Sequence, residues 1–259
     1  MEENNHIKSN VESWMFRVPN ENVFLIFSVT ALLAFGIAFS LLNIYIFAFL
    51  LLSAVVFIRL HQAQYLGNSV RVHSSQFPEI YQIFKEYVIR LGITKAALYI
   101  KQDPYLQAYT LGINNCTVIL TSSLVEQLSK EELNFVIAHE LGHFKARHTL
   151  ISTFINPLGV NNVLGNFIFS FWNRKAEYSC DRCGLILTKD INAAVSSLLK
   201  LSIGANLYKD FNLQGYIAQI RKAESKQVKL SEVVIDHPLI TNRIKSLILF
   251  WKENFVKLS

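Results

Sequence analysis

The longest apolar run in this chain extends from residue 23 to residue 58, 36 positions without a single Asp, Glu, Lys, Arg or His. As one helix it would be about 54 Å long, whereas the hydrocarbon core of a bilayer is about 30 Å thick. Two short spans joined by a turn near Leu41 to Asn43 fit this thickness better than one strongly tilted helix. We therefore predict a transmembrane helical hairpin, which places the segments before and after it on the same side of the membrane.

Helical periodicity appears in two places beyond this run. Residues 77–92 have the pattern of an amphipathic helix, and Gly92 is suited to end it. Between Ser129 and His148 apolar residues recur at helical spacing, and Ser129 and Glu132 form a capping box that begins a helix. Short runs rich in β-branched and aromatic residues lie between these helices. They predict strands of a small sheet at residues 97–101, 106–111 and 117–121.

A second uncharged run, Thr149 to Asn173, is interrupted by Asn, Pro and Gly and is too short for two spans. A single span would separate the later residues from residues 129–148 by the membrane. We therefore predict a loop or helical hairpin that packs over the site or enters the membrane interface. Residues 173–187 predict another helix, and a last helix is expected to begin near Asp236-His237-Pro238.

Composition and charge add to this topology. Hydrophobic residues make up 51% of the chain and the mean hydropathy is +0.28, which agrees with an integral membrane protein. Basic residues flank the apolar run, and the positive-inside rule places the following domain in the cytoplasm, on a cell or inner membrane. These residues are Lys8, Arg17, Arg59 and Arg71. The net charge of +6 is dispersed and the sequence holds no nucleic-acid-binding motif, so nucleic acid is not an expected partner.

The predicted helix after Ser129 contains His139-Glu140-Leu141-Gly142-His143, which is the HExxH pattern. Side chains four residues apart lie on one face of a helix, so both imidazoles can bind one metal ion. Glu140 can then face a water in the open coordination position, where zinc activates water for attack on a carbonyl. An ordinary amphipathic helix is the alternative, but the independent helix signals favour a site for one zinc ion and peptide-bond hydrolysis.

An HExxH zinc site still needs a third protein ligand. Common solutions are a His six residues after the second His or a carboxylate on a later helix. The sixth residue here is Thr149, so the first solution fails. Glu177 and Asp181 lie four apart on one face of the predicted 173–187 helix, and we expect one to bind the metal and the other to orient a histidine ring. An exposed acidic face is the alternative.

Cys180 and Cys183 form a C-x-x-C beside these carboxylates, but the only other cysteine is the distant Cys116. A thiolate zinc site is therefore disfavoured, and we interpret the pair as small buried residues that permit close helix packing. Three cysteines offer no disulfide framework, which agrees with a reducing compartment. His237, just before the last helix, is either a surface residue or a donor to a developing oxyanion.

Three stretches, in this order, resemble the membrane-anchored gluzincin metallopeptidases, which include the bacterial heat-shock protease HtpX and the eukaryotic prenyl-protein endopeptidases. They are VILTSSLVEQLSKEELNFVIAHELGHFKARH, EYSCDR and DHPLITNRI. The resemblance implies a zincin-type domain. It also implies that His139, His143 and Glu177 bind zinc and that Glu140 is the base. Asp181 is then expected to orient one of the ligands without binding the metal itself.

The same resemblance implies that His237 and Arg243 help to bind substrate or to stabilise the tetrahedral intermediate. Members of the family often have Asn-Ala near a substrate-binding edge strand, where this chain has Gln107-Ala108-Tyr109. The backbone of Ala108 and Tyr109 can still pair with an extended peptide. Two further departures are a cysteine at position 180, where Ala is typical, and the absence of a longer membrane insertion between the two halves of the metal site.

We expect an α+β chain with an N-terminal segment (1–22), a transmembrane hairpin (23–58) and a mainly helical zinc metallopeptidase domain with a small sheet (59–259). The leading hypothesis is a membrane-anchored endopeptidase that acts on polypeptides such as misfolded or membrane proteins, in contact with the lipid bilayer. The alternative is a catalytically silent, zinc-stabilised adaptor or chaperone-like protein, which the intact Glu140 disfavours. The helix that carries the HExxH motif is too polar to lie inside a membrane, which disfavours an intramembrane protease. The sequence does not identify the oligomeric state.

Overall fold

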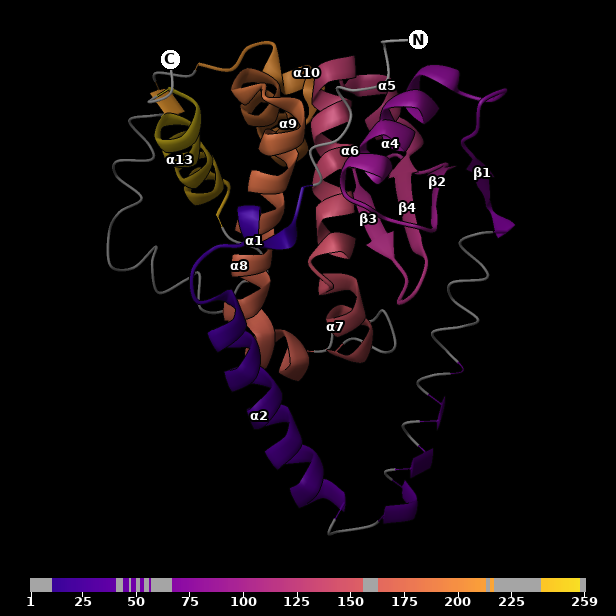
Figure 1. The fold of residues 1–259 in the computed structure, drawn as a ribbon, viewed down its shortest axis with the longest axis vertical. Coiled ribbons are helices and arrows are strands. Elements are labelled where there is room, and N and C mark those ends of the chain that lie inside the picture. The colour runs from indigo at the N-terminus through magenta and orange to yellow at the C-terminus, as the bar shows by residue number, and fades with distance from the viewer. Residues whose placement is uncertain are drawn as a thin grey trace.

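The computed structural model describes residues 11–40, 67–155, 163–212 and 239–256, together with residues 44–46, 48, 49, 52, 53, 56, 215 and 216. These residues form a helical domain that contains one four-stranded sheet, and a long helix extends away from the domain (Figure 1). The predicted α+β class, mainly helical with a small sheet, is therefore confirmed.

The sheet has the strand order β1-β2-β4-β3, in which β2 and β4 are parallel and the other neighbours are antiparallel. The strands are β1 (Ser69–Arg71), β2 (Ala96–Lys101), β3 (Ala108–Leu111) and β4 (Cys116–Thr121). Strand β3 lies at one edge, with Ala108 opposite Leu120 and Leu111 opposite Thr117. The three predicted strands are confirmed with small shifts at their ends, while β1 has no counterpart in the sequence prediction.

Three helices connect the sheet to the rest of the domain. Helices α4 (Pro78–Arg90) and α6 (Lys130–Lys145) pack on the sheet, and α8 (Val163–Thr188) packs against α6 (Figure 1). The shorter elements are α1 (Ser13–Phe16), α5 (Ser122–Gln127), α7 (His148–Ile155), α9 (Ile191–Ile203), α10 (Ala205–Tyr208), α13 (Ile240–Trp251) and the π-helical turn η1 (Lys252–Val256). The main core lies between the sheet and these helices.

The helices predicted at 77–92 and after Ser129 are confirmed, whereas α8 begins at Val163, ten residues before the predicted start at 173, and the C-terminal helix also differs. Helix α4 matches the predicted helix at 77–92, and Gly92 takes a left-handed φ of +64° just after it. The uncharged run at 149–173 is helical at both ends, in α7 and α8, while residues 156–162 lie outside the described residues. Helix α13 begins at Ile240, after Leu239 with extended backbone, which is later than predicted.

The capping box at the start of α6 is confirmed. The Glu132 backbone N–H donates to Ser129 Oγ at 3.3 Å, and the Ser129 backbone N–H donates to Glu132 Oε2 at 2.7 Å. Further along, α6 approaches α8 so closely that a Cβ added at Gly142 would lie 3.0 Å from the Cβ of Cys183. Cys180 and Cys183 are fully buried there, so their interpretation as small packing residues is supported.

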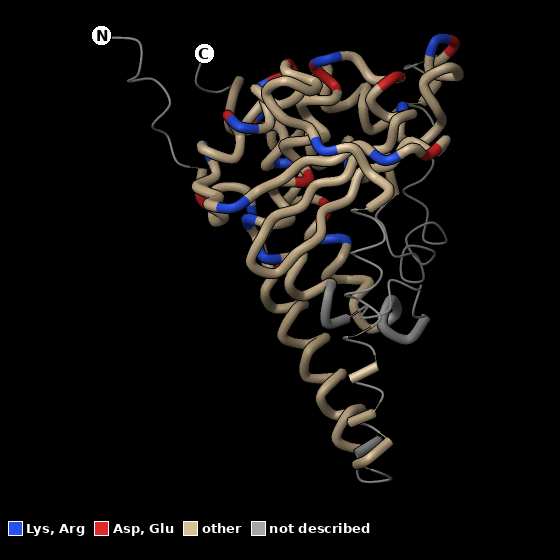
Figure 2. The backbone as a smooth tube through the Cα atoms, turned by 90° about the vertical axis from the view of Figure 1, so that its right-hand side faces the viewer, with Lys and Arg blue, Asp and Glu red and all other residues tan. Residues whose placement is uncertain are grey.

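Helix α2 (Glu21–Ser40) extends away from the domain and carries no charged side chain after its first residue (Figure 2). Its stretch Glu21–Ala38 is the one segment within the described residues that is long and apolar enough to cross a membrane, and 11% of it is buried. The helix is described as far as Ser40. Residues 41–43 and about half of the predicted second span lie outside the described residues, so the hairpin stays a prediction.

The base of α2 packs against the first half of α8 rather than against the main core. A smaller apolar cluster forms there around Phe169 and Trp172, with Phe24 and Leu25 of α2 packed against it. Ser28 Oγ of α2 also donates a hydrogen bond to the carbonyl oxygen of Ile168 at 2.8 Å. The apolar helix is therefore joined to α8, the helix that carries Glu177 and Asp181.

Candidate metal centre

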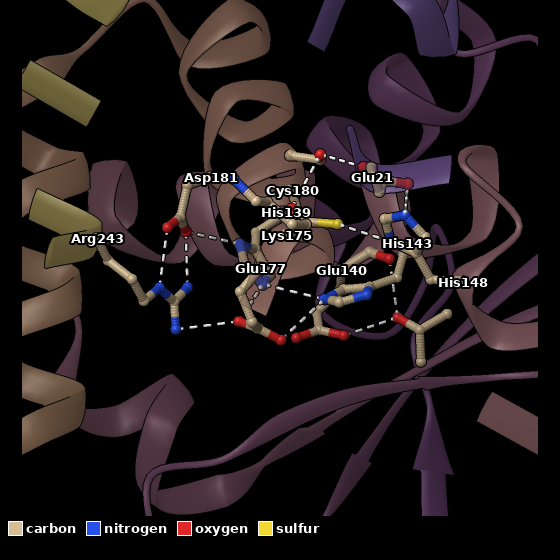
Figure 3. A network of polar contacts seen from close by, with 12 residues as sticks. Glu21, His139, Glu140, His143, His148, Lys175, Glu177, Cys180, Asp181 and Arg243 are labelled. Carbon is tan, nitrogen blue, oxygen red and sulfur yellow. Dashed lines mark hydrogen bonds and ion pairs between the residues drawn. The ribbon is translucent and has the colours of Figure 1, made fainter. Parts of the chain in front are cut away.

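Helices α6 and α8 bring the two halves of the predicted site together. His139 and His143 lie one turn apart on α6 and both face Glu177 on α8 (Figure 3). Their Nε2 atoms are 3.2 Å apart. Glu177 Oε2 lies 3.5 Å from His139 Nε2, and Glu177 Oε1 lies 3.5 Å from His143 Nε2. The ligand atoms converge on one point between the helices.

These separations fit a tetrahedral metal ion. With metal–nitrogen bonds of about 2.05 Å, a tetrahedral zinc ion holds its ligand atoms roughly 3.3 Å apart. The 3.2 Å between the two Nε2 atoms is close to that value, and each oxygen of Glu177 lies 3.5 Å from one of these nitrogens. Two imidazoles and one carboxylate form a ligand set that zinc uses in hydrolytic enzymes and that leaves a fourth position for water or substrate. The residues present therefore fit zinc.

Asp181 and Arg243 contact the side chains of the predicted metal ligands. His139 Nδ1 lies 3.0 Å from Asp181 Oδ1, an ion-pair contact rather than a well-aligned hydrogen bond. Arg243, on α13, donates to both oxygens of Asp181, at 2.9 and 2.6 Å, and lies 3.0 Å from Glu177 Oε2. The guanidinium thus orients both carboxylates. Such partners fix the tautomer and orientation of a metal-binding histidine.

Glu140 projects from α6 beside the ligand atoms and contacts the sheet. The hydroxyl of Thr110 on β3 lies 2.8 Å from Glu140 Oε2 and 3.0 Å from the Glu140 carbonyl oxygen, so it can donate to either one. Thr110 therefore restrains the predicted base. Sequence reasoning missed this residue, because a threonine in a strand carries no signal for a contact 30 positions away.

Charge in the centre is balanced mainly by Arg243. Burial by itself raises the pKa of Glu177 and of Asp181, but the Arg243 guanidinium and the neighbouring histidines hold both pKa values below their ordinary range, Glu177 far below. Both carboxylates are therefore ionised near neutral pH. An ionised Glu177 can bind a cation without first losing a proton.

The histidines and Glu140 respond differently to the same surroundings. Burial lowers the pKa of His143 well below its usual value, so its ring is neutral and ready to bind metal. Burial also lowers the pKa of His139, but Asp181 and Glu177 outweigh it and raise that pKa to about 10 in the metal-free protein. Burial raises the pKa of Glu140, which moves this carboxylate toward the range that suits a general base.

A cavity of about 420 Å³ opens between the metal centre and strand β3. Its lining combines polar groups of the site with apolar side chains. It is lined by Leu106, Gln107, Ala108, Tyr109, Phe135, Val136, His139, Glu140, Glu177, Leu198, Leu201 and Arg243. Ala108 and Tyr109 thus line the same cavity as Glu140, Glu177 and Arg243. His237 lies outside the described residues.

A second buried polar group, which we name the anchor cluster, lies beside the metal centre and was missed by sequence reasoning. It consists of Glu21, His148, Ser179 and Cys180 (Figure 3). Glu21 Oε1 lies 2.8 Å from His148 Nε2, Ser179 Oγ donates to Glu21 Oε2, and Cys180 Sγ lies 3.4 Å from His148 Nδ1. Contacts over 127 and 158 positions of sequence leave no local pattern to find.

The HExxH helix, the carboxylate helix and the adjoining cavity form a candidate site for metal-dependent hydrolysis. Comparison with known proteins agrees: residues 74–164 match the model described as Peptidase family M48. Over 170 residues the chain is 35% identical to the plastoglobule-localized metallopeptidase 48, chloroplastic, of Arabidopsis thaliana, a match that covers 60% of this chain and 49% of that protein. Residues 74–164 thus resemble the M48 peptidase family, and the chain spans about half the length of this relative.

Proposed function

We propose that this protein is a membrane-anchored, zinc-dependent endopeptidase. One observation carries the proposal: His139, His143 and Glu177 each offer a ligand atom within 4.8 Å of the others, beside a buried carboxylate, Glu140, that lines the adjoining cavity. A structural zinc site closes its coordination sphere with four protein ligands, whereas this arrangement leaves one position open toward the cavity. Open coordination beside a general base is the arrangement of hydrolytic enzymes.

The chemistry divides among the residues of the site. Zinc held by His139, His143 and Glu177 would supply a Lewis acid that lowers the pKa of water and polarises the scissile carbonyl. Glu140, restrained by Thr110, would take the proton from the attacking water and return it to the leaving amine. Asp181 and Arg243 would keep His139 and Glu177 oriented during this exchange, and we retain His237 as a candidate oxyanion donor.

The edge strand suggests how a polypeptide substrate is held. Strand β3 pairs with β4 on one side, and its residues Ala108 and Tyr109 line the cavity on the way to Glu140. An extended peptide that adds to this edge would be held by backbone hydrogen bonds, whatever its sequence. We propose misfolded or membrane proteins as substrates, because such a mode requires unfolded segments and the site lies on helices joined to α2.

Membrane attachment is supported by α2, whose large apolar side chains are mostly exposed along its length. We propose that α2 and the following apolar residues anchor the protein in a cell or inner membrane, with the catalytic domain in the cytoplasm. Tags at residue 1 and at residue 259 are then expected to be accessible from the same, cytoplasmic side. Accessibility from opposite sides would contradict the hairpin.

The decisive experiment replaces Glu140 with Gln in the full-length protein. Gln is nearly isosteric with Glu but accepts no proton, so zinc content and membrane insertion should persist while cleavage of casein falls roughly 10²- to 10⁴-fold. Glu131→Gln is the matched control, because it removes a charge from the exposed side of the same helix and should leave cleavage unchanged. Undiminished cleavage by Glu140→Gln, or no cleavage by the unmodified zinc-loaded protein, would contradict the proposed function.

A further inference from the structure

The anchor cluster places a carboxylate where membrane anchoring alone does not require one. Glu21 is the first residue of α2 and is 1% exposed. A helix N-terminus favours a nearby negative charge, but a solvated side chain at the membrane surface would serve equally well. Burial of a carboxylate is costly unless it is paired and hydrogen-bonded. Glu21 meets that condition through His148 and Ser179, which belong to the elements that build the metal centre.

Besides Arg17, the partners of Glu21 are His148 and Ser179, and both lie close to a predicted zinc ligand. Ser179 and Cys180 lie on α8 between Glu177 and Asp181. His148 follows α6, and its ring meets that of His143 edge-on, with ring centroids 5.3 Å apart. A shift of α2 at Glu21 would therefore move the backbone that carries one ligand and the ring that confines another.

The cluster also engages both ring nitrogens of His148. His143, His148 and Cys180 form a second group whose potential ligand atoms lie within 4.8 Å of one another. In the observed arrangement Glu21 contacts Nε2 of His148, and Cys180 contacts Nδ1. Loss of Glu21 would release one nitrogen of His148 beside His143, where the freed ring could compete for the metal or for the orientation of His143.

We propose that Glu21 is a positioning residue through which the anchor helix α2 holds the geometry of the metal centre, acting through His148 and Ser179. The metal centre is complete only when the base of α2 is docked against α8. This inference rests on the proposed zinc site and extends it, because it makes the anchor a part of the catalytic domain rather than a tether.

The test compares Glu21→Gln with Ser28→Ala in the full-length protein. Both side chains connect α2 to a partner outside it by a buried polar contact, but Ser28 bonds to the Ile168 carbonyl, away from the ligands. Zinc retention against a chelator and the kcat and KM for casein cleavage are measured on both. Glu21→Gln should lose zinc about tenfold more readily than the unmodified protein, which is the size of effect expected when a partner that orients a metal ligand is removed. It should also lower kcat while KM stays nearly unchanged. Ser28→Ala should match the unmodified protein in both measurements.

Ser179→Ala provides a second arm, since it removes one hydroxyl and keeps the contact between Glu21 and His148. It should weaken zinc retention less than Glu21→Gln does, and the double variant should show less than the sum of the two effects because both act through one carboxylate. Zinc retention and kcat equal to those of Ser28→Ala in both variants would overturn the inference. If the unmodified protein cleaves nothing, the proposed function fails, whereas the zinc measurements still decide whether Glu21 positions the site.

Discussion

The metal centre and the anchor cluster are both buried polar groups packed around α8, but they differ in how completely their members are paired. In the anchor cluster every residue is at most 1% exposed, and the carboxylate of Glu21 has both oxygens in contact with partners. In the metal centre two imidazole nitrogens face each other at 3.2 Å, and the side chains of His143 and Glu177 remain 19% and 13% exposed. The anchor cluster is therefore closed, whereas the metal centre has room for a cation and a substrate.

This difference shows why burial alone does not mark a functional site. A fully paired cluster gains nothing from a ligand, because its charges are already compensated. A cluster whose donor atoms converge without satisfying one another gains a large free energy from a metal ion. Substitutions that act on one cluster and not on the other therefore test the assignment of roles, and the expected effects below run from the largest to the smallest.

Loss of a ligand should have the largest effect. Purified protein is expected to hold about one zinc ion per chain. Glu177→Ala, like His139→Ala or His143→Ala, should abolish stable zinc occupancy after dialysis, measured by metal analysis. Cys180→Ala in the anchor cluster should keep the zinc. If Glu177→Ala kept full zinc while Cys180→Ala lost it, the two clusters would have exchanged roles.

Removal of Arg243 should destabilise the metal-free protein strongly. Arg243→Met leaves Glu177 and Asp181 buried without their cation, and breaking such a pair costs about 3 to 5 kcal/mol. Zinc should restore part of this stability, because it returns positive charge to Glu177. Melting temperatures in detergent, with zinc and with a chelator, measure both effects. Arg17→Met, which removes the cation beside Glu21, is the control, and zinc should restore none of the stability that this variant loses.

Acidification should destabilise the metal-free centre. The pKa values of Glu177 and Asp181 are lower in the folded than in the unfolded protein, so their contribution is present above pH 4.5 and is lost as pH falls below it. His139, with a folded pKa of about 10, contributes fully below pH 6.5 and loses its contribution as pH rises toward 10. Each carboxylate can change the stability by at most about 1.4 kcal/mol per pH unit. Denaturation midpoints at pH 7, 5 and 4 measure the trend, and Asp181→Asn should flatten it.

A smaller effect is expected at the close contact between α6 and α8 at Gly142. Gly142→Ala adds a methyl group 3.0 Å from Cys183 Cβ and 3.1 Å from its Sγ. Overpacking of this kind costs about 1 to 3 kcal/mol, which exceeds the roughly 1 kcal/mol by which Ala favours a helix over Gly. Thermal unfolding should show this loss, and Cys183→Ala in the same background should recover part of it. A more stable Gly142→Ala protein would contradict the close packing.

Local signals account for the parts of the fold that were predicted. The start of α6 follows from the capping box of Ser129 and Glu132, and the two histidines share a face because they are four residues apart. The short strand β1 was missed because three residues gain their stability from pairing with β2 rather than from their own pattern. Helix α9 was also missed, although Asp190, which accepts a hydrogen bond from the Ala193 backbone N–H, carried a usable N-cap signal.

The sequence by itself determined which helices carry the site, because capping and the spacing of side chains on a helix depend on neighbouring residues. Residue spacing left open whether Glu177 or Asp181 faces the metal, and the family resemblance implied Glu177. The tertiary structure places Glu177 3.5 Å from both histidines, a position that depends on how α8 is rotated and seated against α6, which the contact between Gly142 and Cys183 helps to fix. For the same reason the contact of Glu21 with His148 could not be foreseen: it joins residues 127 positions apart that meet only when α2 docks on the domain.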